Sequence, residues 1–489
     1  MPADTRKSID AALELNSVTK RFHTKGRTVH ALDGVSIAVR RGIVTGIIGP
    51  DGAGKTTLMR LVAGLLTPDQ GTISVLNIDA ISEPQRVQSI VGYMPQRFGL
   101  YEDLSVKENL DLYADLHAVH EADRASHYSD LMRMTGLAPF MRRLAGKLSG
   151  GMKQKLGLAC SLVGTPPLLL LDEPTVGVDP VSRRELWTII HRLVEERSAT
   201  VLLSTAYLDE AERCNEVILL HEGRLLGQNE PAAFTRQLVG RSFHVFASHM
   251  SKRALQERIN QAPGVLDAII QGSRVRVVTQ QAVAPTAEQI TGGAAPDVQI
   301  APVAARLEDS FVTRLKGSID VPRAARPAPA FTAAAPSYTP SGEDVIGVRN
   351  LSRRFGDFYA VRNVSFTVGR GEVFGLLGAN GAGKSTTFRM LCGLLPASEG
   401  TLRVAGVDLR SAAAQARARV GYMAQKFSLY GDLSVVENLR FFSSAYRLQG
   451  GHQRERVGPS LNSSWARSPM RPAATARWDS SNASPWPSP

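Results

Sequence analysis

Two glycine-rich loops, each followed by a lysine and two hydroxyl residues, are the clearest chemical feature of this chain. The first loop contains Gly49, Gly52, Gly54, Lys55, Thr56 and Thr57, and the second, 329 residues later, contains Gly378, Gly381, Gly383, Lys384, Ser385 and Thr386. Between a strand and a helix, such a loop points backbone N–H groups at phosphate oxygens, and bulkier side chains would block that approach. The lysine reaches the β- and γ-phosphates, and the first hydroxyl ligates Mg²⁺. We therefore predict two loops that bind a nucleoside triphosphate.

A pair of carboxylates follows a strongly apolar run after the first loop. Four leucines at residues 168–171 predict a buried strand, and Asp172 and Glu173 come directly after them. Carboxylates at the end of such a strand face the phosphates, where Asp172 suits Mg²⁺, usually through water, and Glu173 polarises an attacking water. The sequence therefore predicts a hydrolytic site built from the first loop and this strand.

The surrounding pattern alternates between strands and helices. Residues 43–48, 201–204 and 217–220 predict strands, and residues 56–65 predict a helix. Asp179 and Pro180 make an N-cap and first-turn pair for a helix that runs to Glu196. Residues 13–240 are therefore expected to form an α/β nucleotide-binding domain.

The rest of the chain divides into four parts. We expect a small α+β appendage at residues 241–320, a Pro/Ala-rich linker at 321–344, and a second, truncated copy of the first domain at 345–456. Residues 457–489 lack hydrophobic periodicity but hold three of the four tryptophans. Reading residues 477–487 in a shifted codon frame permits a sequence similar to residues 150–159, so we predict a disordered tail that is a frameshifted reading of the second domain.

Composition excludes several classes of protein. The chain is 43% hydrophobic and 21% charged, as in ordinary globular proteins, and no apolar run approaches the roughly 18 residues of a membrane span. No apolar signal core follows the N-terminus, and three widely spaced cysteines fit buried thiols in a reducing cytoplasm. The net charge of +12 fits a solvated basic surface, and we expect no nucleic-acid partner.

One further motif resembles a known family. Ser149, Gly150 and Gly151, within residues 148–154, are similar to the signature of ABC-type ATPases, in which the serine and the glycine backbone contact the γ-phosphate of ATP held by the opposite domain. The resemblance implies two P-loop NTPase domains of the ABC type in tandem, with ATP and Mg²⁺ as ligands. Gln96 and Gln425 then resemble the glutamine that senses Mg²⁺ and the γ-phosphate.

Other positions match the family one by one. Phe22 and Phe355 resemble the aromatic residue that stacks on adenine, although ordinary core positions are the alternative. Residues 177–179 resemble the D-loop, and residues 204–212, here called the switch segment, resemble a region that usually carries a histidine after Ser-Thr. Here that position is Ala206, so the resemblance implies intact ATP binding with slow hydrolysis.

Two kinds of ABC protein carry tandem ATPase domains without membrane spans. Residues 173–180 resemble drug and polysaccharide exporters, and residues 98–110, repeated at 427–439, resemble the segment that receives a transmembrane subunit, with plain helix packing as the alternative. We therefore expect a subunit on the cytoplasmic, inner face of the membrane that powers efflux of drugs or other hydrophobic solutes through separate permease subunits. A ribosome-associated ABC-F factor is the alternative.

The resemblance also implies that the truncation leaves both ATP sites incomplete. In this family two domains close head to tail, so each ATP needs one domain's loop and the other domain's signature. The similarity between the two copies ends shortly after residue 450, before any second signature or carboxylate strand. We therefore expect this chain to hydrolyse little ATP by itself, and expect dimerisation through the first domain to restore a symmetric site.

Overall fold

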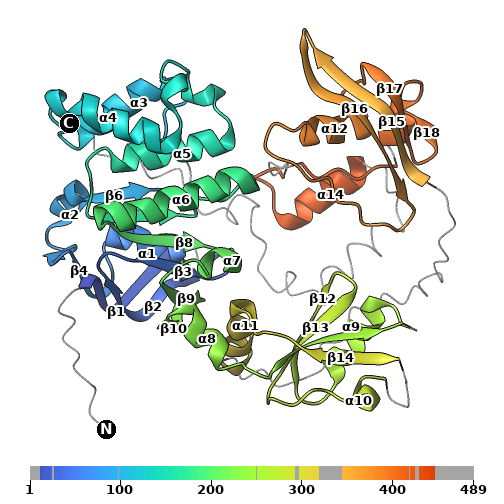
Figure 1. Cartoon of the computed structure of the whole chain (residues 1–489), viewed down its shortest axis with the longest axis horizontal. Coiled ribbons are helices and arrows are strands. Elements are labelled where there is room, and N and C mark those ends of the chain that lie inside the picture. The colour runs from blue at the N-terminus through green and yellow to red at the C-terminus, as the bar shows by residue number, and fades with distance from the viewer. Residues whose placement is uncertain are drawn as a thin grey trace. The chain divides into compact units, whose positions relative to one another are not determined.

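The computed structural model describes residues 11–24, 27–96, 99–248, 250–291, 297–318, 344–417, 419–424 and 429–445, which belong to two compact units (Figure 1). The first unit comprises residues 1–330 and the second comprises residues 331–489. Almost all of the predicted linker, the whole predicted tail, and Gln425 lie outside the described residues.

A six-stranded sheet forms the centre of the first unit. Its order is β10-β9-β3-β8-β7-β6, and β9, β3, β8, β7 and β6 run parallel. The bounds are β3 Val44–Ile48, β6 Val91–Met94, β7 Leu168–Asp172, β8 Thr200–Thr205, β9 Glu216–His221 and β10 Arg224–Asn229. The strands predicted at residues 43–48, 201–204 and 217–220 correspond to β3, β8 and β9. The α/β class predicted for this region is confirmed.

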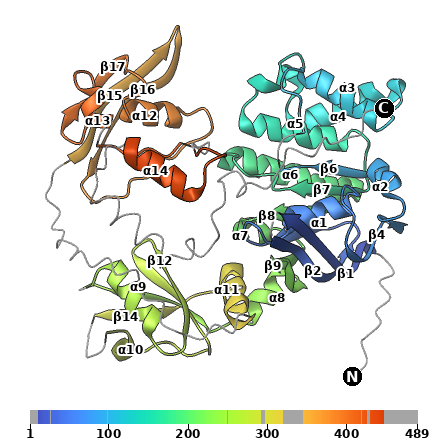
Figure 2. The ribbon, with the colours of Figure 1, turned by 180° about the vertical axis from the view of Figure 1, so that it is seen from behind.

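Both faces of this sheet are buried, which explains why its strands are continuous apolar runs. Along β7, Leu168 and Leu170 pack in one core with helix α1 (Lys55–Val62). Leu169 and Leu171 pack in a second core with α3 to α6. These helices are α3 Val106–Leu116, α4 Glu121–Thr135, α5 Gly150–Leu162 and α6 Pro180–Arg197 (Figures 1 and 2).

A smaller antiparallel sheet covers α1. Its order is β2-β1-β4-β5, with β1 Ala11–Thr24, β2 Arg27–Arg40, β4 Gln70–Val75 and β5 Ile78–Asp79. The short helices of this domain are α2 Pro84–Ile90, α7 Leu208–Ala211 and α8 Pro231–Arg236, with single 3₁₀ turns at Ala138–Phe140 and Ala145–Lys147. Helix α1 ends three residues earlier than the predicted 56–65, because Gly64 adopts a left-handed conformation with φ of 66°.

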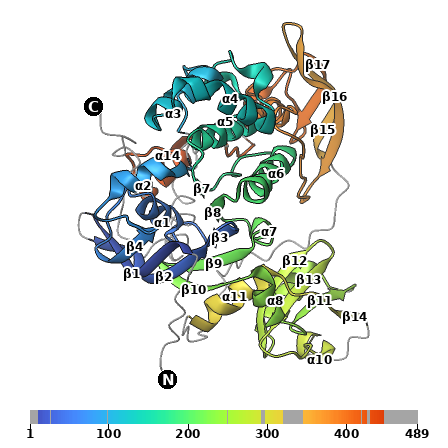
Figure 3. The ribbon, with the colours of Figure 1, turned by 60° about the vertical axis from the view of Figure 1, so that its left-hand side comes forward.

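The appendage has a split β-α-β arrangement. Its elements are β11 Ser242–Ala247, α9 Lys252–Gln261, β12 Val265–Gln271, β13 Arg274–Thr279, α10 Ala287–Thr291 and β14 Val298–Pro302, and the sheet order is β12-β13-β11-β14. Helix α11 (Leu307–Ser318) joins this sheet to the central domain (Figure 3). On one side the Asp309 carboxylate pairs with buried Arg276 at 2.6 Å, and on the other Leu307 packs in the α3–α6 core.

The second unit repeats the first at the same offset. Its elements are β15 Asp344–Phe355, β16 Phe358–Gly369, α12 Lys384–Leu391, β17 Glu399–Val404, β18 Val407–Asp408, α13 Ala413–Arg417 and α14 Val435–Ala445, with sheet order β16-β15-β17-β18. Helices α12 and α14 lie 329 residues after α1 and α3, at both ends. The duplication seen in the sequence is therefore a duplication of structure.

The central parallel sheet is missing from the described residues of the second unit. The segments that correspond to β3 and β6, residues 373–377 and 420–423, form no strand. Val373, Leu377 and Met423 are 99%, 91% and 90% exposed, whereas their counterparts Val44, Ile48 and Met94 are buried in the first unit. Parallel strands need neighbours supplied by later segments, and counterparts of β7 and β8 do not occur among these described residues.

Candidate nucleotide-binding site

The first phosphate loop curls between β3 and the N-terminus of α1. Gly52 and Gly54 have φ values of 81° and 101°, and a Cβ on Gly54 would lie 2.4 Å from the carbonyl oxygen of Ala31, so only glycine fits. The Lys55 ammonium donates hydrogen bonds to the carbonyl oxygens of Gly49 at 2.8 Å and Pro50 at 3.2 Å. Thr56 and Thr57 follow in the first turn of α1, whose N-terminus favours bound anions.

The second phosphate loop has the same geometry. The Lys384 ammonium donates to the carbonyl oxygens of Gly378 at 2.6 Å and Ala379 at 2.7 Å, and Gly381 and Gly383 have φ values of 86° and 84°. Ser385 and Thr386 begin α12. The loop is therefore formed, although nothing in the described part of this unit stands where β7 brings carboxylates in the first unit.

Asp172 lies at the end of β7 and is 1% exposed. The Ser204 hydroxyl donates to its Oδ1 at 2.6 Å, while its Oδ2 is buried and has no hydrogen-bond partner. Burial raises the pKa of the Asp172 carboxyl, and the hydrogen bond from Ser204 and the nearby Thr56 hydroxyl only partly offset that effect. A buried carboxylate oxygen with no partner beside a threonine hydroxyl fits a Mg²⁺ site, because hard cations prefer such oxygens.

Glu173, the next residue, lies at the centre of the site. Its Oε1 lies 3.3 Å from the Lys55 ammonium, and its Oε2 accepts a hydrogen bond from the Gln96 amide at 2.6 Å. Its φ of 51° is unusual for a residue with a side chain, and such backbone strain is concentrated at functional sites. The Ser204 hydroxyl holds this turn by accepting from the Glu173 backbone N–H at 2.9 Å. The structure thus brings together Lys55, Gln96, Asp172 and Glu173.

Removing the Asp172 charge should raise the stability of the domain and weaken its binding of Mg²⁺. The folded-state pKa of Asp172 lies above the ordinary value of 3.8. Ionisation of this carboxyl therefore reduces the free energy of unfolding at pH values above 3.8. We expect Asp172→Asn to raise the melting temperature of the nucleotide-free first domain at pH 8 by about 2–4 °C, which corresponds to about 1 kcal/mol.

The gain in stability from Asp172→Asn should shrink as the pH falls through the raised pKa toward 3.8, because the wild-type carboxyl is then neutral in the folded state. The same variant should lose the Mg²⁺ dependence of ATP binding. Thermal melts at pH 8 and pH 5, with ATP titrations in Mg²⁺ and in EDTA, measure both effects. A lower melting temperature at pH 8 would contradict the assignment.

The signature residues begin helix α5. Ser149 is its N-cap, and the Ser149 side chain accepts from the backbone N–H of Met152 at 3.3 Å. Gly150 and Gly151 form the first turn, and a Cβ on Gly151 would lie 2.5 Å from the Ser182 hydroxyl. That hydroxyl donates to Asp179, the N-cap of α6, at 2.8 Å. Glycine is therefore required where the signature packs against the residues that resemble the D-loop.

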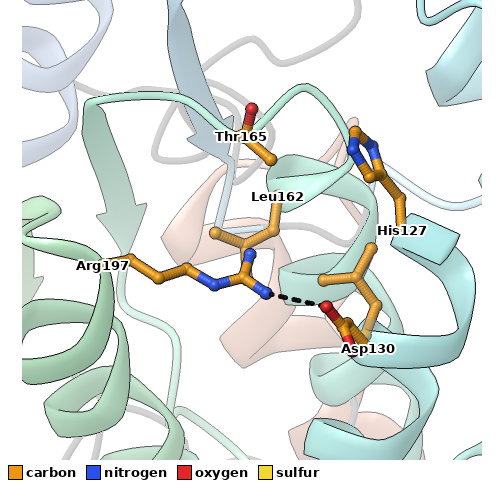
Figure 4. A pocket seen from close by; sticks show the side chains of 6 residues that line it. His127, Asp130, Leu162, Thr165 and Arg197 are labelled. Carbon is orange, nitrogen blue, oxygen red and sulfur yellow. Dashed lines mark ion pairs between the residues drawn. The ribbon is translucent and has the colours of Figure 1, made fainter. Parts of the chain in front are cut away.

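A pocket of about 250 Å³ lies elsewhere in the first unit (Figure 4). It is lined by His127, Asp130, Leu131, Leu162, Thr165 and Arg197. Across it an Arg197 guanidinium nitrogen lies 3.7 Å from the Asp130 carboxylate, which links α6 to α4. None of the predicted site residues lines this pocket, so it is separate from the nucleotide site.

Comparison with known proteins agrees with this geometry. The family model described as "ABC transporter" matches residues 32–176 and 361–479, together more than half of the chain. The chain belongs to the ABC transporter family. It is 50% identical over 456 residues to the probable multidrug ABC transporter ATP-binding protein YbhF of Escherichia coli (strain K12), a match that covers 92% of this chain and 76% of that protein. It is 35% identical over 252 residues to the daunorubicin/doxorubicin resistance ATP-binding protein DrrA of Streptomyces peucetius, covering 51% and 75%.

Family membership confirms the predicted ABC-type fold, ATP and Mg²⁺ as ligands, and ATPase activity as the enzymatic class of the chain. ATP-binding subunits of this family work with membrane permease subunits. Among the helices in the described ranges, none combines the length and the hydropathy that a membrane span requires.

Three further residues singled out by the sequence lie on β1, on β15 and directly after β8. Phe22 is half-buried on β1 and Phe355 is 47% exposed on β15, with the Arg353 guanidinium 4.6 Å from the Phe355 ring. Neither ring is buried in the core. Stacking on adenine requires a ring that is accessible in this way. Ala206 is exposed directly after β8. Sequence reasoning missed Ser204, whose hydroxyl links the Asp172 carboxylate and the Glu173 backbone N–H to β8, because a serine within an apolar strand gives no signal of its own.

Proposed function

We propose that the first domain binds ATP with Mg²⁺ and powers a separate membrane permease that exports drugs or other hydrophobic solutes. The observation that carries this proposal is the buried cluster in which Glu173 contacts both Lys55 and Gln96 beside Asp172. In it, Lys55 and the loop glycines hold the phosphates, Thr56, Asp172 and Gln96 hold Mg²⁺, and Glu173 is the general base. The names of the relatives support an exporter and give no support to a ribosome-bound factor.

The loop that follows Gln96 in the chain, before α3, offers a surface that suits the permease contact. Asn109 of α3 is fully buried, and its side-chain amide donates to the carbonyl oxygens of Tyr101, Leu104 and Ser105, which fixes the loop before the helix. The Tyr101 side chain, held on this loop, is 56% exposed. We place the permease contact here, on the inner face of the membrane.

The same loop is tied to the signature helix. The Glu102 carboxylate lies 2.6 Å from the Lys153 ammonium of α5, and the Glu102 carbonyl accepts from the Gly146 backbone N–H at 2.8 Å. A displacement of Tyr101 by the permease would therefore move α5 and Ser149. This is the route by which ATP-driven closure would be transmitted to the membrane subunit.

We infer that hydrolysis by this chain needs the first domain of a second copy of the chain. ATP on one first domain would be closed by Ser149 of another copy, because the described residues of the second unit contain neither a counterpart of β7 nor a counterpart of α5. The second phosphate loop then contributes binding without hydrolysis.

Co-expression with a multi-span permease from the same operon tests the export role. We expect the two proteins to purify together and ATP turnover to rise on reconstitution in lipid, and expect Tyr101→Ala to abolish that rise while ATP binding persists. Co-sedimentation with ribosomes instead of with permease would overturn the proposal.

Restoring the missing imidazole should speed hydrolysis. Ala206 is exposed after β8, so a histidine fits there without repacking the core. We expect Ala206→His to raise ATP turnover about tenfold or more, as an added group that stabilises charge at the γ-phosphate would. Phosphate release at saturating ATP measures this, with Ala206→Asn as a polar control. An unchanged rate would show that this site does not use the contact.

A further inference from the structure

One buried carboxylate outside the predicted site joins three of its segments. Glu210 of α7 is 0% exposed. Its Oε2 accepts hydrogen bonds from the Thr175 hydroxyl and from the Thr205 hydroxyl, both at 2.8 Å. A buried charge is costly unless it is paired and hydrogen-bonded. Loss of either threonine contact would therefore destabilise the folded domain.

The charge of Glu210 is balanced by one arginine. The Arg183 Nε lies 3.3 Å from Glu210 Oε1, and the Arg183 guanidinium lies 4.5 Å from the Tyr207 ring centre. Arg183 is in the first turn of α6, the helix that Asp179 caps. The pair therefore connects the beginning of α6 to the switch segment.

Each partner of Glu210 belongs to a different part of the site. Thr175 follows Glu173 by two residues, in the turn where Glu173 has its positive φ. Thr205 lies between Ser204, which bonds Asp172 and Glu173, and Ala206. The Thr205 hydroxyl also accepts from the Tyr207 backbone N–H at 3.0 Å. Glu210 thus fixes the Glu173 turn, the switch segment and the start of α6 relative to one another.

We propose that Glu210, with Arg183, is a positioning residue for ATP hydrolysis. It does not touch ATP; it sets the direction of the Glu173 carboxylate through Thr175 and holds the switch segment through Thr205. Arg183 is the residue of α6 that ties the switch segment to this helix, through Glu210 at 3.3 Å and through exposed Asp209 at 3.5 Å, in a chain whose Ala206 supplies no imidazole. This inference rests on the proposed hydrolytic role of the first domain.

Substitutions in the full chain test the proposal. We expect Glu210→Gln and Arg183→Gln each to lower ATP turnover at saturating ATP about tenfold, because small misplacements of a catalytic group are costly, while the Kd for ATP changes by less than about twofold. The double variant should be no slower than either single variant, since the two side chains act as a unit. Arg184→Gln, at an exposed neighbour on the same helix, should leave turnover unchanged.

Hydrogen exchange gives a readout that does not need turnover. We expect Glu210→Gln to make the amides of residues 173–176 and 205–207 exchange about tenfold faster, with amides of α1 unchanged. Thr175→Val should loosen residues 173–176 alone. If the wild type shows no ATP turnover, the proposed function fails. Hydrogen exchange at residues 173–176 and 205–207 then decides by itself whether Glu210 positions these segments.

Unchanged exchange at residues 173–176 in Glu210→Gln would overturn the proposal. Additive losses of turnover in the double variant, or equal losses of ATP affinity and turnover, would also overturn it, because they indicate general destabilisation. A melting curve for each variant identifies one that fails to fold; Thr175→Val, which keeps the buried ion pair, then serves as the test.

Discussion

Glu173→Gln should lower ATP turnover by about a hundredfold or more, the usual contribution of a general base, without loss of ATP binding. Glutamine keeps the size of the side chain and its contact with Gln96, but it takes no proton from water. It also removes the carboxylate that lies 3.3 Å from the Lys55 ammonium, which leaves that cation free for phosphate oxygens. Affinity for ATP should therefore be unchanged or higher.

Single-turnover hydrolysis and equilibrium ATP binding measure the two effects of Glu173→Gln separately. Asp103→Asn, at an acidic residue on the surface of the loop before α3, is the control for loss of one negative charge. Turnover within about threefold of the wild type would show that another group is the base.

Lys55→Ala should remove ATP binding from the first domain. The Lys55 side chain is 5% exposed, and without it the phosphates lose a buried positive charge while Glu173 loses its ion pair. We expect ATP affinity to fall about a hundredfold or more, which corresponds to about 3 kcal/mol.

Lys384→Ala is the matched variant in the second phosphate loop. Because Lys384 makes the same loop contacts, its removal tests the loop alone, without the carboxylates of β7. We expect it to leave hydrolysis unchanged and to remove a weaker binding event in calorimetry. Loss of hydrolysis in Lys384→Ala, with activity kept in Lys55→Ala, would reverse our assignment of the active domain.

Local patterns indicate a candidate site where the chemistry lies in continuous segments. The phosphate loops and the Asp172–Glu173 pair are recognisable because glycine, lysine and carboxylate positions follow directly from strand and helix boundaries. The helix from Pro180 and strands β3, β8 and β9 were predicted for the same reason. Mg²⁺ coordination by Asp172 stays a prediction, which the buried Oδ2 without a hydrogen-bond partner supports.

Contacts between distant segments could not be predicted. Glu210 and Arg183 lie on separate helices, and no spacing in the sequence indicates that Thr175 and Thr205 meet at one carboxylate. Residues 373–377 show that a strand-like local sequence is not enough to form a strand. They resemble β3 in sequence, yet they form no strand, because strand formation in a parallel sheet depends on partners elsewhere in the chain.

We infer that the first domain hydrolyses ATP only when it pairs with the first domain of a second copy of the chain. ATP turnover per chain, measured over about a hundredfold range of protein concentration alongside the molecular mass, tests it directly, because mass action makes dimer-dependent activity rise with concentration. We expect turnover that is low for the monomer and rises to a plateau as dimers form in ATP. High turnover per chain that stays constant while the protein remains monomeric would contradict it.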